Sequence, residues 1–468
     1  MKPGKTSWRI KSVSIFSFLF SYMLSFVFEG QVLYSLLKDS GLKADSYIVT
    51  GIVATCIGLF SCGFFIKTLR MAKSIMAGGM LVSLAATLPF FFAPSALWLA
   101  ALGVTGFSAS CAIAAWGYFL KAFTPRDERI HSCADVLIAS NILMTLINVV
   151  AMNISPLIGL ALSTSCLFIG TLLVWRLPAD ETPAPATTAE RNSPGDLKKP
   201  MILLFLFVSI ITVNSGLMYQ VINPAFAHLT GLVSGYWAIP YIIALVVMRN
   251  LPAKTNRSLI LYLGMVMIMG AFISFMLMGR GAADYLVINT LMLGACGIFD
   301  LFWWSILGGM LDYAKNPVKV FGIGLSANVF GVLCGGILGL GVTSIALPDA
   351  QVTVIALTVV CVTLVLLPPL NRQLVMLLKN HVYLTAYSGM SEKQQSSIIQ
   401  HTEILVPLTQ REKDVLLQVL TGKSNKAIAE VLFVSENTVK SHLKNIYAKY
   451  DVNSRSELIS FILKNRIP

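Results

Sequence analysis

The residues with the clearest chemistry lie near the end of the chain, where short polar and basic side chains recur at helical spacing. Five residues of a helix expected over 435–450 share one face: Asn437, Lys440, Ser441, Lys444 and Ala448. Lysine ammonium groups neutralise phosphates, and short side chains allow a helix to approach base edges in a major groove. This face has the chemistry of a DNA-reading surface, with His442 and Lys449 beside it and within reach of phosphates.

The opposite face of the same helix is apolar and must be buried. It consists of residues at i, i+4, i+7 and i+11, namely Val439, Leu443, Ile446 and Tyr450. Four helix starts carry capping signals: Thr409 with Glu412, Ser424, Ser435, and Ser454 with Glu457. The sequence therefore predicts a small four-helix unit in which the Ser435-capped helix is the third.

Taken together, four strings of this unit resemble the LuxR-type (NarL/FixJ-like) DNA-binding domain over residues 404–468. They are LTQREKDVL (408–416), SNKAIA (424–429), SENTVKSHLKNI (435–446) and VNSRSEL (452–458). The resemblance implies that helix 435–450 reads the groove with Thr438, Val439, Lys440 and Lys444 nearest the DNA. It also implies that helix 454–463 forms a two-fold dimer contact on a palindromic operator in double-stranded DNA. The full set of expected DNA contacts is Lys426, Asn437, Thr438, Val439, Lys440, Ser441, His442, Lys444 and Lys449.

A second group of candidate residues lies in the apolar part of the chain. Asp300 falls near the middle of a long apolar run, with Trp303 and Trp304 on the same helical face. Ionisable residues are costly inside a bilayer, so each is a functional candidate. A carboxylate beside two indoles suits a small aromatic or cationic ligand, whereas pairing of Asp300 with a neighbouring helix is the structural alternative. Three further candidates for lining a ligand site are Glu29, Trp116 and Asn214.

The elements that must position these residues divide into a long apolar body and a short polar tail. Of the 468 residues 56% are hydrophobic and only 12% are charged, about half the charged fraction of ordinary soluble domains. Twelve apolar runs are long enough to cross a bilayer as helices. They are expected near 12–36, 46–66, 74–93, 96–120, 135–152, 154–175, 200–222, 229–248, 258–278, 284–311, 320–342 and 349–370.

Basic residues mark one side of these spans. Nineteen lysines and arginines fall in the loops on the side that holds both termini, and only Lys38, Lys43 and Arg280 fall on the other. Because basic loops stay in the cytoplasm, the sequence predicts a multi-pass protein of a bacterial cell membrane, surrounded by lipid, with both termini and the DNA reader in the cytoplasm. The first apolar run is too long for a signal peptide and has no A-x-A cleavage site, so a retained span is expected.

Two six-helix halves with a long connection resemble the major facilitator superfamily over residues 1–370. The loop after the second span keeps the family's basic character in Lys67, Arg70 and Lys73, but it has neither the aspartate nor the second glycine of the usual motif. The predicted all-α chain comprises a membrane half (1–176), a cytoplasmic linker (177–199), a second membrane half (200–370), a tether (371–403) and the helix-turn-helix domain (404–468).

Other function classes have weaker support. The eight cysteines form no CxxC pair, the five histidines are scattered, and no phosphate-binding loop is present, so neither an enzyme nor a cofactor nor a metal site is expected. The favoured interpretation is a membrane-tethered, one-component transcription factor that senses a small molecule in its transmembrane bundle and regulates promoters. The alternative is a major-facilitator-like transporter with an added regulatory tail. Neither the ligand, the operator nor the direction of regulation follows from the sequence.

Overall fold

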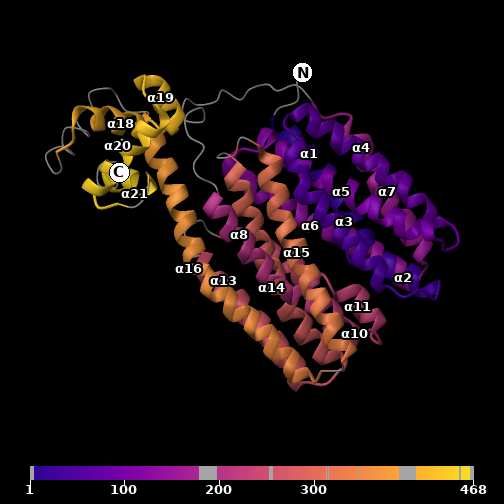
Figure 1. Ribbon diagram of the computed structural model, residues 1–468. Helices are drawn as coiled ribbons and strands as arrows, with labels where there is room; N and C mark the ends of the chain where they lie inside the picture. The colour runs from indigo at the N-terminus through magenta and orange to yellow at the C-terminus, as the bar shows by residue number, and fades with distance from the viewer. Residues whose placement is uncertain are drawn as a thin grey trace. The chain divides into compact units, whose positions relative to one another are not determined.

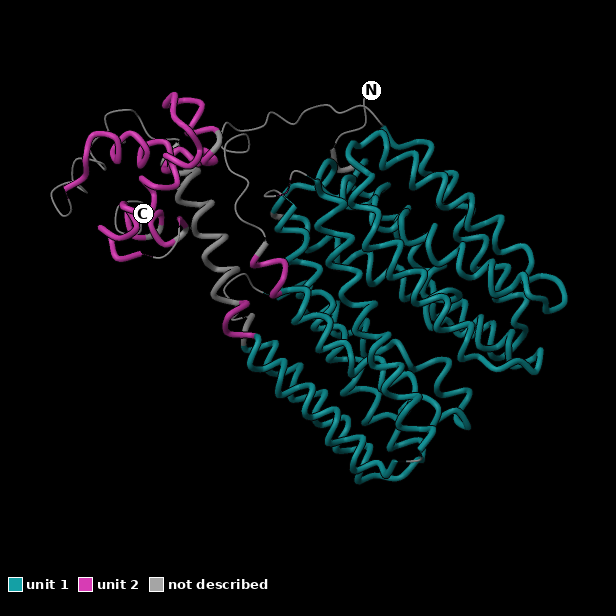
Figure 2. Tube along the Cα trace, in the orientation of Figure 1, with its two compact units in different colours: residues 1–181, 204–312, 316–366 teal, residues 182–203, 313–315, 367–468 magenta. Residues whose placement is uncertain are grey.

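The chain folds into helices that group in two compact units (Figure 2). The computed structural model describes residues 5–178, 198–251, 257–311, 314, 316–345, 347–388, 407–452 and 455–463, and none of these residues is in a β-strand. The first unit comprises residues 1–181, 204–312 and 316–366, and the second comprises 182–203, 313–315 and 367–468. We call described residues 5–388, which hold the described part of the first unit, the body, and described residues 407–452 and 455–463, all in the second unit, the tail. The all-α prediction is confirmed.

Among the described residues, the body has twelve helical spans that are long and apolar enough to cross a membrane, the number that the sequence predicts, and some spans comprise more than one helix. Its N-terminal half consists of α1 (Lys5–Tyr22), η1 (Met23–Val27), α2 (Gln31–Asp39), α3 (Asp45–Phe65), α4 (Leu69–Thr87), η2 (Leu88–Phe91), α5 (Ala96–Phe123), η3 (Arg126–Glu128), α6 (Arg129–Asn153) and α7 (Pro156–Val174). Its C-terminal half consists of α8 (Lys198–Ile211), α9 (Val213–Leu217), η4 (Met218–Ile222), α10 (Asn223–Ala225), α11 (Thr230–Tyr236), α12 (Ile239–Arg249), α13 (Arg257–Leu277), α14 (Ala282–Met310), α15 (Pro317–Ser344) and α16 (Asp349–Ser388). Figure 1 shows the bundle that these helices form.

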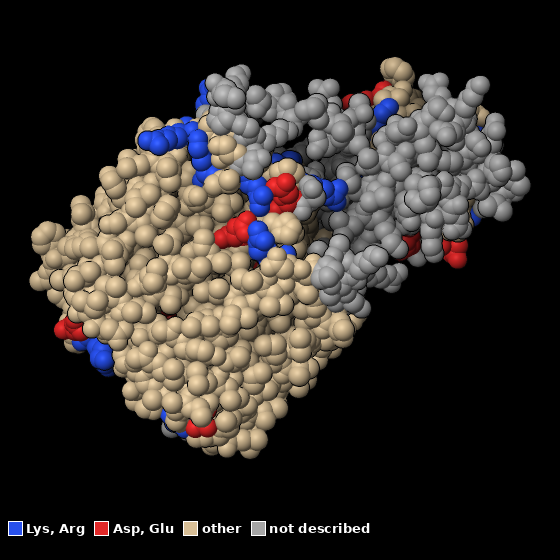
Figure 3. Space-filling model, turned by 180° about the vertical axis from the view of Figure 1, so that it is seen from behind, with Lys and Arg blue, Asp and Glu red and all other residues tan. Residues whose placement is uncertain are grey.

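The surface of the body matches a protein embedded in lipid. Large apolar side chains such as Phe92, Leu146 and Val365 are exposed on it. Figure 3 shows charged side chains gathered at the ends of the body, with a broad band between them that is free of visible charge. Such a band is what a bilayer requires of its protein neighbours.

The first span of each half is interrupted, which hydropathy did not predict. In span 1 the π-helix η1 ends at a break over 28–30, where Glu29 has the left-handed φ of 52°. A Cβ on Gly30 would lie 2.3 Å from the backbone of Ser25, so only glycine fits at this break. In span 7 the π-helix η4 interrupts the corresponding position of the second half. Paired interruptions of this kind commonly border the ligand site in two-half transporter folds.

Close backbone contacts hold span 11 against span 7. A Cβ on Gly335 of α15 would lie 2.1 Å from the carbonyl oxygen of Val213, and one on Gly331 would lie 2.1 Å from that of Ser209. In the same contact, Gly216 of the facing helix α9 lies close to the backbone of α15. Small residues allow such approach between membrane helices, where packing rather than the hydrophobic effect stabilises the contact.

Ion pairs join the two halves at the end of the bundle where the loops are basic. Arg9 contacts Glu128 (2.7 Å) and Asp135 (3.2 Å) within the N-terminal half. Asp135 also contacts Arg249, at the end of α12 in the C-terminal half, with an Nε–Oδ1 distance of 2.7 Å. Asp135 thus links the halves, and each of these partly exposed pairs contributes about 0–1 kcal/mol.

The tail has its own hydrophobic core. It contains α18 (Gln410–Leu420), α19 (Asn425–Leu432), α20 (Glu436–Lys449) and α21 (Arg455–Leu463). The core collects apolar residues from all four helices, and the predicted stripe of Val439, Leu443, Ile446 and Tyr450 lies within it. Between α19 and α20, Phe433 adopts a left-handed φ of 55° and is 95% exposed, so it makes the turn without packing in the core.

Candidate functional site

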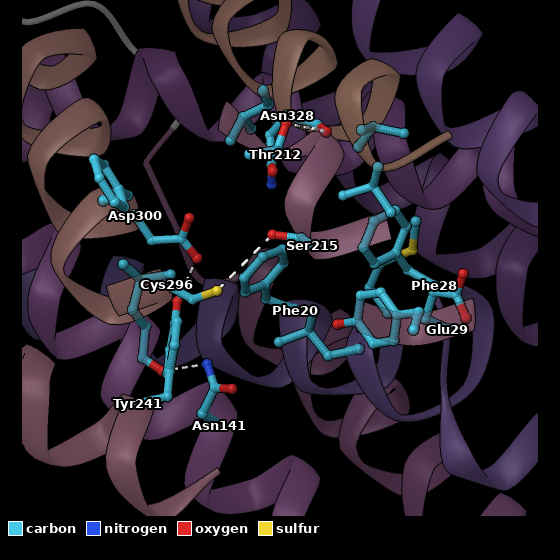
Figure 4. Close-up of a pocket in the computed structure, with 18 of the residues that line it drawn as sticks. Phe20, Phe28, Glu29, Asn141, Thr212, Ser215, Tyr241, Cys296, Asp300 and Asn328 are labelled. Atoms are coloured by element: carbon cyan, nitrogen blue, oxygen red, sulfur yellow. Dashed lines mark hydrogen bonds between the residues drawn. The ribbon is translucent and has the colours of Figure 1, made fainter. Parts of the chain in front are cut away.

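A cavity of about 140 Å³ lies between the two halves of the body. Residues of both interrupted spans line it, together with residues of spans 2, 4, 5, 8, 9, 10 and 11. Figure 4 shows Asp300, Cys296 and Tyr241 on one side, and Phe28 and Glu29 on the opposite side. At roughly 10–15 Å³ for each water-sized position, the cavity accommodates a small molecule of about ten non-hydrogen atoms.

Asp300 is the best-organised polar group of this cavity. The Tyr241 hydroxyl donates a hydrogen bond to Oδ2 (2.7 Å), and the Trp303 indole Nε1 donates one to Oδ1 (3.1 Å). Both donors are neutral, and no Lys, Arg or His is among the described residues that line the cavity. Asp300 is therefore held in position by hydrogen bonds from neutral groups, with no cation among the described residues that line the cavity.

Four of the six predicted ligand residues line the cavity, namely Glu29, Asp300, Trp303 and Trp304. Trp116 does not: its Nε1 donates to Ser12 Oγ (2.9 Å), and its ring packs on Phe16 with centroids 4.3 Å apart. Asn214 is buried and also lies outside the lining residues. These two residues are corrected as cavity-lining residues: Trp116 packs against α1, and Asn214 is buried but is not among the residues that line the cavity.

Sequence reasoning missed several polar groups of the cavity wall. Tyr241 lies 59 residues from Asp300, so its hydrogen bond gives no local signal. Thr55 Oγ1, Asn148 Oδ1 and Trp237 Nε1 are buried in the wall without a hydrogen-bond partner among the described residues. Each lies in an apolar run, where a single polar residue is usually explained by helix–helix hydrogen bonding.

The second candidate site is the exposed face of α20 in the tail. Asn437, Thr438, Lys440, Ser441 and Lys444 are exposed, as a groove-reading face requires. Ser435 caps the helix by accepting a hydrogen bond from the Thr438 amide (3.1 Å). Lys440 has one ion pair, to the exposed Glu436 one turn away (3.0 Å), and such a pair gives way easily to a phosphate. His442 is half-buried at the edge of this face.

The other predicted DNA contacts are Val439, Lys449 and Lys426. Val439 is 0% exposed in the tail core, so its side chain packs there and is withdrawn as a DNA contact. Lys449 donates to Glu412 Oε2 (2.6 Å) and to the Pro407 carbonyl oxygen (3.2 Å), so it joins α20 to α18, and its contact with a phosphate stays a prediction. The side chain of Lys426 lies outside the described residues.

Glu412 is a buried carboxylate that caps α18 and joins it to α20. Its carboxylate accepts hydrogen bonds from the Thr409 amide (2.8 Å) and from Lys449, and its own amide donates to Thr409 Oγ1 (3.3 Å), which completes the predicted capping box. Burial favours the neutral acid, but the hydrogen bonds from Lys449 and Thr409 outweigh burial and hold the pKa of Glu412 below its ordinary value. The stabilisation from Glu412 is therefore present above the ordinary glutamate pKa and is lost as the pH falls through the lower, folded-state pKa.

We expect Glu412→Gln to lower the free energy of unfolding of the tail at pH 7 by about 1–2 kcal/mol, because a charge-assisted hydrogen bond to a partly exposed lysine is weakened. The deficit should shrink toward pH 3. Urea denaturation of separately produced residues 404–468, followed by circular dichroism at both pH values, measures this difference. Glu436→Gln, which alters an exposed ion pair, should change stability by less than about 0.5 kcal/mol. An undiminished deficit for Glu412→Gln at pH 3 would contradict the assigned role.

Helix α21 packs on the tail core through Leu458, Ile459 and Ile462. Arg455 fixes its start by donating to the carbonyl oxygens of Lys423 (2.5 Å) and Val419. Phe461, at 53% exposure, leaves an apolar ring on the outer side of the helix. A dimer contact through residues 454–463 stays a prediction.

The tail matches a known family. Residues 406–462 match the family described as bacterial regulatory proteins, luxR family. Over 57 residues the chain is 53% identical to the uncharacterized transcriptional regulatory protein YhcZ of Bacillus subtilis, covering 12% of this chain and 27% of that protein. It is 47% identical over 58 residues to the CsgBAC operon transcriptional regulatory protein of Escherichia coli, covering 12% and 27%. Since the chain spans about a quarter of these relatives, the similarity identifies a DNA-binding domain and no more.

The body matches a solved structure in fold alone. It is similar to the human organic anion transporter MFSD10 (TETRAN), with a TM-score of 0.58 and 13% identity, over 78% of this chain and 100% of that one. The described residues thus combine a body that shares its fold with this neighbour, and that has twelve helices long and apolar enough to cross a membrane, with a luxR-family DNA-binding domain.

Proposed function

We propose that this chain, with its luxR-family DNA-binding domain, is a membrane-tethered one-component transcription factor whose body senses a small molecule. The observation that carries the proposal is the joining of an exposed, correctly capped α20 face to a body with a cavity between its halves. The basic loops favour a topology with both termini and the tail in the cytoplasm, where the tail has access to DNA. We also propose that the chain is divided as its sequence predicts, into two membrane halves, the linker between them, a tether and the DNA-binding domain.

In this function, the arrangement of the two halves connects the cavity to the tail. The cavity is walled by both halves, and the Asp135–Arg249 ion pair joins the halves at their basic end. A ligand that draws the halves together or apart changes this end of the body, and thereby the availability or dimerisation of the tail. Such coupling requires that the ligand bind the two arrangements of the body with different affinity. If full-length protein and the separate tail bound DNA identically with every compound tried, the coupling would be wrong.

Transcript profiling tests the proposed function. A strain lacking the protein is compared with one carrying Lys440→Ala and Lys444→Ala together, each with and without a panel of small molecules. We expect the two strains to differ from wild type at the same few promoters, and one compound class to shift those promoters only in wild type. Unchanged transcripts, with uptake of a compound lost only in the deletion strain, would instead support the transporter alternative.

The transporter alternative rests on the fold of the body, and the human neighbour is described as an organic anion transporter. We do not carry that substrate over to this chain, because the described residues lining the cavity include two carboxylates and no basic side chain. Uptake by membrane vesicles would distinguish a transporting body from a sensing one.

A further inference from the structure

The described residues that line the cavity include two carboxylic side chains and no basic one. Glu29 and Asp300 line it from opposite sides, and no Lys, Arg or His is among the described lining residues. A carboxylate removed from water is stabilised mainly by a nearby cation or by several hydrogen bonds. Glu29 accepts one hydrogen bond, from the Tyr34 hydroxyl (2.6 Å), and Asp300 accepts its two from neutral groups. A cation entering the cavity would therefore meet a carboxyl group on each side and no competing basic side chain among the described lining residues.

Two buried oxygen atoms of the cavity wall also favour a ligand that carries N–H groups. Asn148 Oδ1 and Thr55 Oγ1 are buried without a hydrogen-bond partner among the described residues, and these side chains are only 6% and 2% exposed. A buried polar group without a partner costs about 1–3 kcal/mol, which a ligand N–H recovers. The indole N–H of Trp237 is the complementary case, a donor that a ligand oxygen would satisfy.

Aromatic rings complete the wall. The ring of Trp304 lies 5.7 Å from those of Phe20 and Trp303, centroid to centroid, and all three residues line the cavity. Ring faces attract a cation and also bury an apolar body, and the attraction strengthens where water is excluded. An ammonium group on a small apolar frame uses both properties.

We propose that the cavity binds a small organic cation, an amine protonated at neutral pH, with the Asp300 carboxylate as its counter-ion. The inference rests on the proposed function, since it names the class of ligand sensed by the same site. Asp300, Asn148 and the rings of Trp303 and Trp304 favour an N–H donor of positive charge, and the cavity volume suits a ligand of about ten non-hydrogen atoms.

Binding to purified full-length protein in detergent tests the proposal, with quenching of intrinsic tryptophan fluorescence as the readout and calorimetry as a check. The probes are two matched sets with positive, neutral and negative head groups. They are 2-phenylethylamine, 2-phenylethanol and 3-phenylpropionate, and n-butylamine, n-butanol and butyrate. In at least one set we expect the amine to bind ten times more tightly than the alcohol, and the carboxylate to bind more weakly still. Asp300→Asn should remove this preference by weakening amine binding at least tenfold, while alcohol binding stays within threefold. The control Asp45→Asn, an exposed carboxylate outside the cavity, should leave all affinities unchanged.

An amine that binds no more tightly than its alcohol in both sets overturns the proposal, and so does the absence of binding by all six compounds. Retained amine preference in a folded Asp300→Asn variant overturns the role of Asp300. If that variant does not fold, the ranking of the head groups in the wild-type protein still decides. Since none of these measurements involves DNA, their failure is distinct from failure of the proposed regulatory function.

Discussion

Replacing Lys440 and Lys444 together by glutamate is expected to weaken DNA binding on the order of 100-fold or more. Both side chains extend from the exposed face of α20, and base or phosphate contacts of this kind contribute about 1–3 kcal/mol each. Charge reversal adds repulsion from the phosphates. Fluorescence anisotropy with full-length protein and a promoter fragment identified by transcript profiling measures the change. The plot of log affinity against log salt concentration should become less steep by about 2, because the variant releases two fewer counterions on binding.

A matched control separates this local effect from a general loss of positive charge. Lys444→Glu and Arg411→Glu change the net charge equally, but Arg411 lies on α18, with its side chain 63% exposed. We expect Lys444→Glu to weaken binding at least tenfold and Arg411→Glu to weaken it less than threefold. Equal effects of the two substitutions would mean that α20 does not read the DNA.

Gly335→Ala is expected to destabilise the body by roughly 1–3 kcal/mol or more, the range found when a packed interior is overfilled. The added methyl would lie 2.1 Å from the Val213 carbonyl oxygen and 3.0 Å from the Gly216 Cα, so the backbones of α15 and α9 would have to separate. Thermal denaturation of detergent-solubilised full-length protein, followed by size-exclusion chromatography after heating, should show a lower midpoint for the variant.

The neighbouring glycine supplies the control for this substitution. A Cβ on Gly336 meets no atom within 4 Å, so Gly336→Ala adds the same methyl to the same helix in open space. We expect it to be neutral or slightly stabilising, because alanine restricts the unfolded chain more than glycine does. A similar loss for both variants would show that helix propensity, rather than the contact between α15 and α9, determines the result.

The number and extent of the spans could be predicted because hydropathy is a local property that a bilayer imposes on each helix separately. The interruption of span 1 could not, since Phe28 continues the apolar run and a hydropathy window averages over Glu29 and Gly30. The break depends on the close approach of Gly30 to the backbone of Ser25, which no composition rule describes.

The candidate sites were predictable where their geometry is local. Asp300 and Trp303 are three residues apart on one helix, and their hydrogen bond follows from that spacing. The hydrogen bond from Tyr241 to Asp300 could not be predicted from spacing, because Tyr241 lies on another helix. In the tail, two predictions competed at Val439, and burial in the core prevailed over the DNA contact that family resemblance implied. The contact between Lys449 and Glu412 was not predicted, because Glu412 lies 37 residues earlier in the chain.

On α20, the residues that hold the helix and the residues that face outward are different residues. Val439, Leu443 and Ile446 fix the helix in the core, whereas Asn437 and Lys444 contribute nothing to that core. Drift at the outward positions therefore changes which genes are controlled without changing whether the protein folds. If the proposed function holds, substitutions at the outward positions of α20 would change the promoters that the tail binds, and they would leave both the tail core and the cavity of the body unaltered.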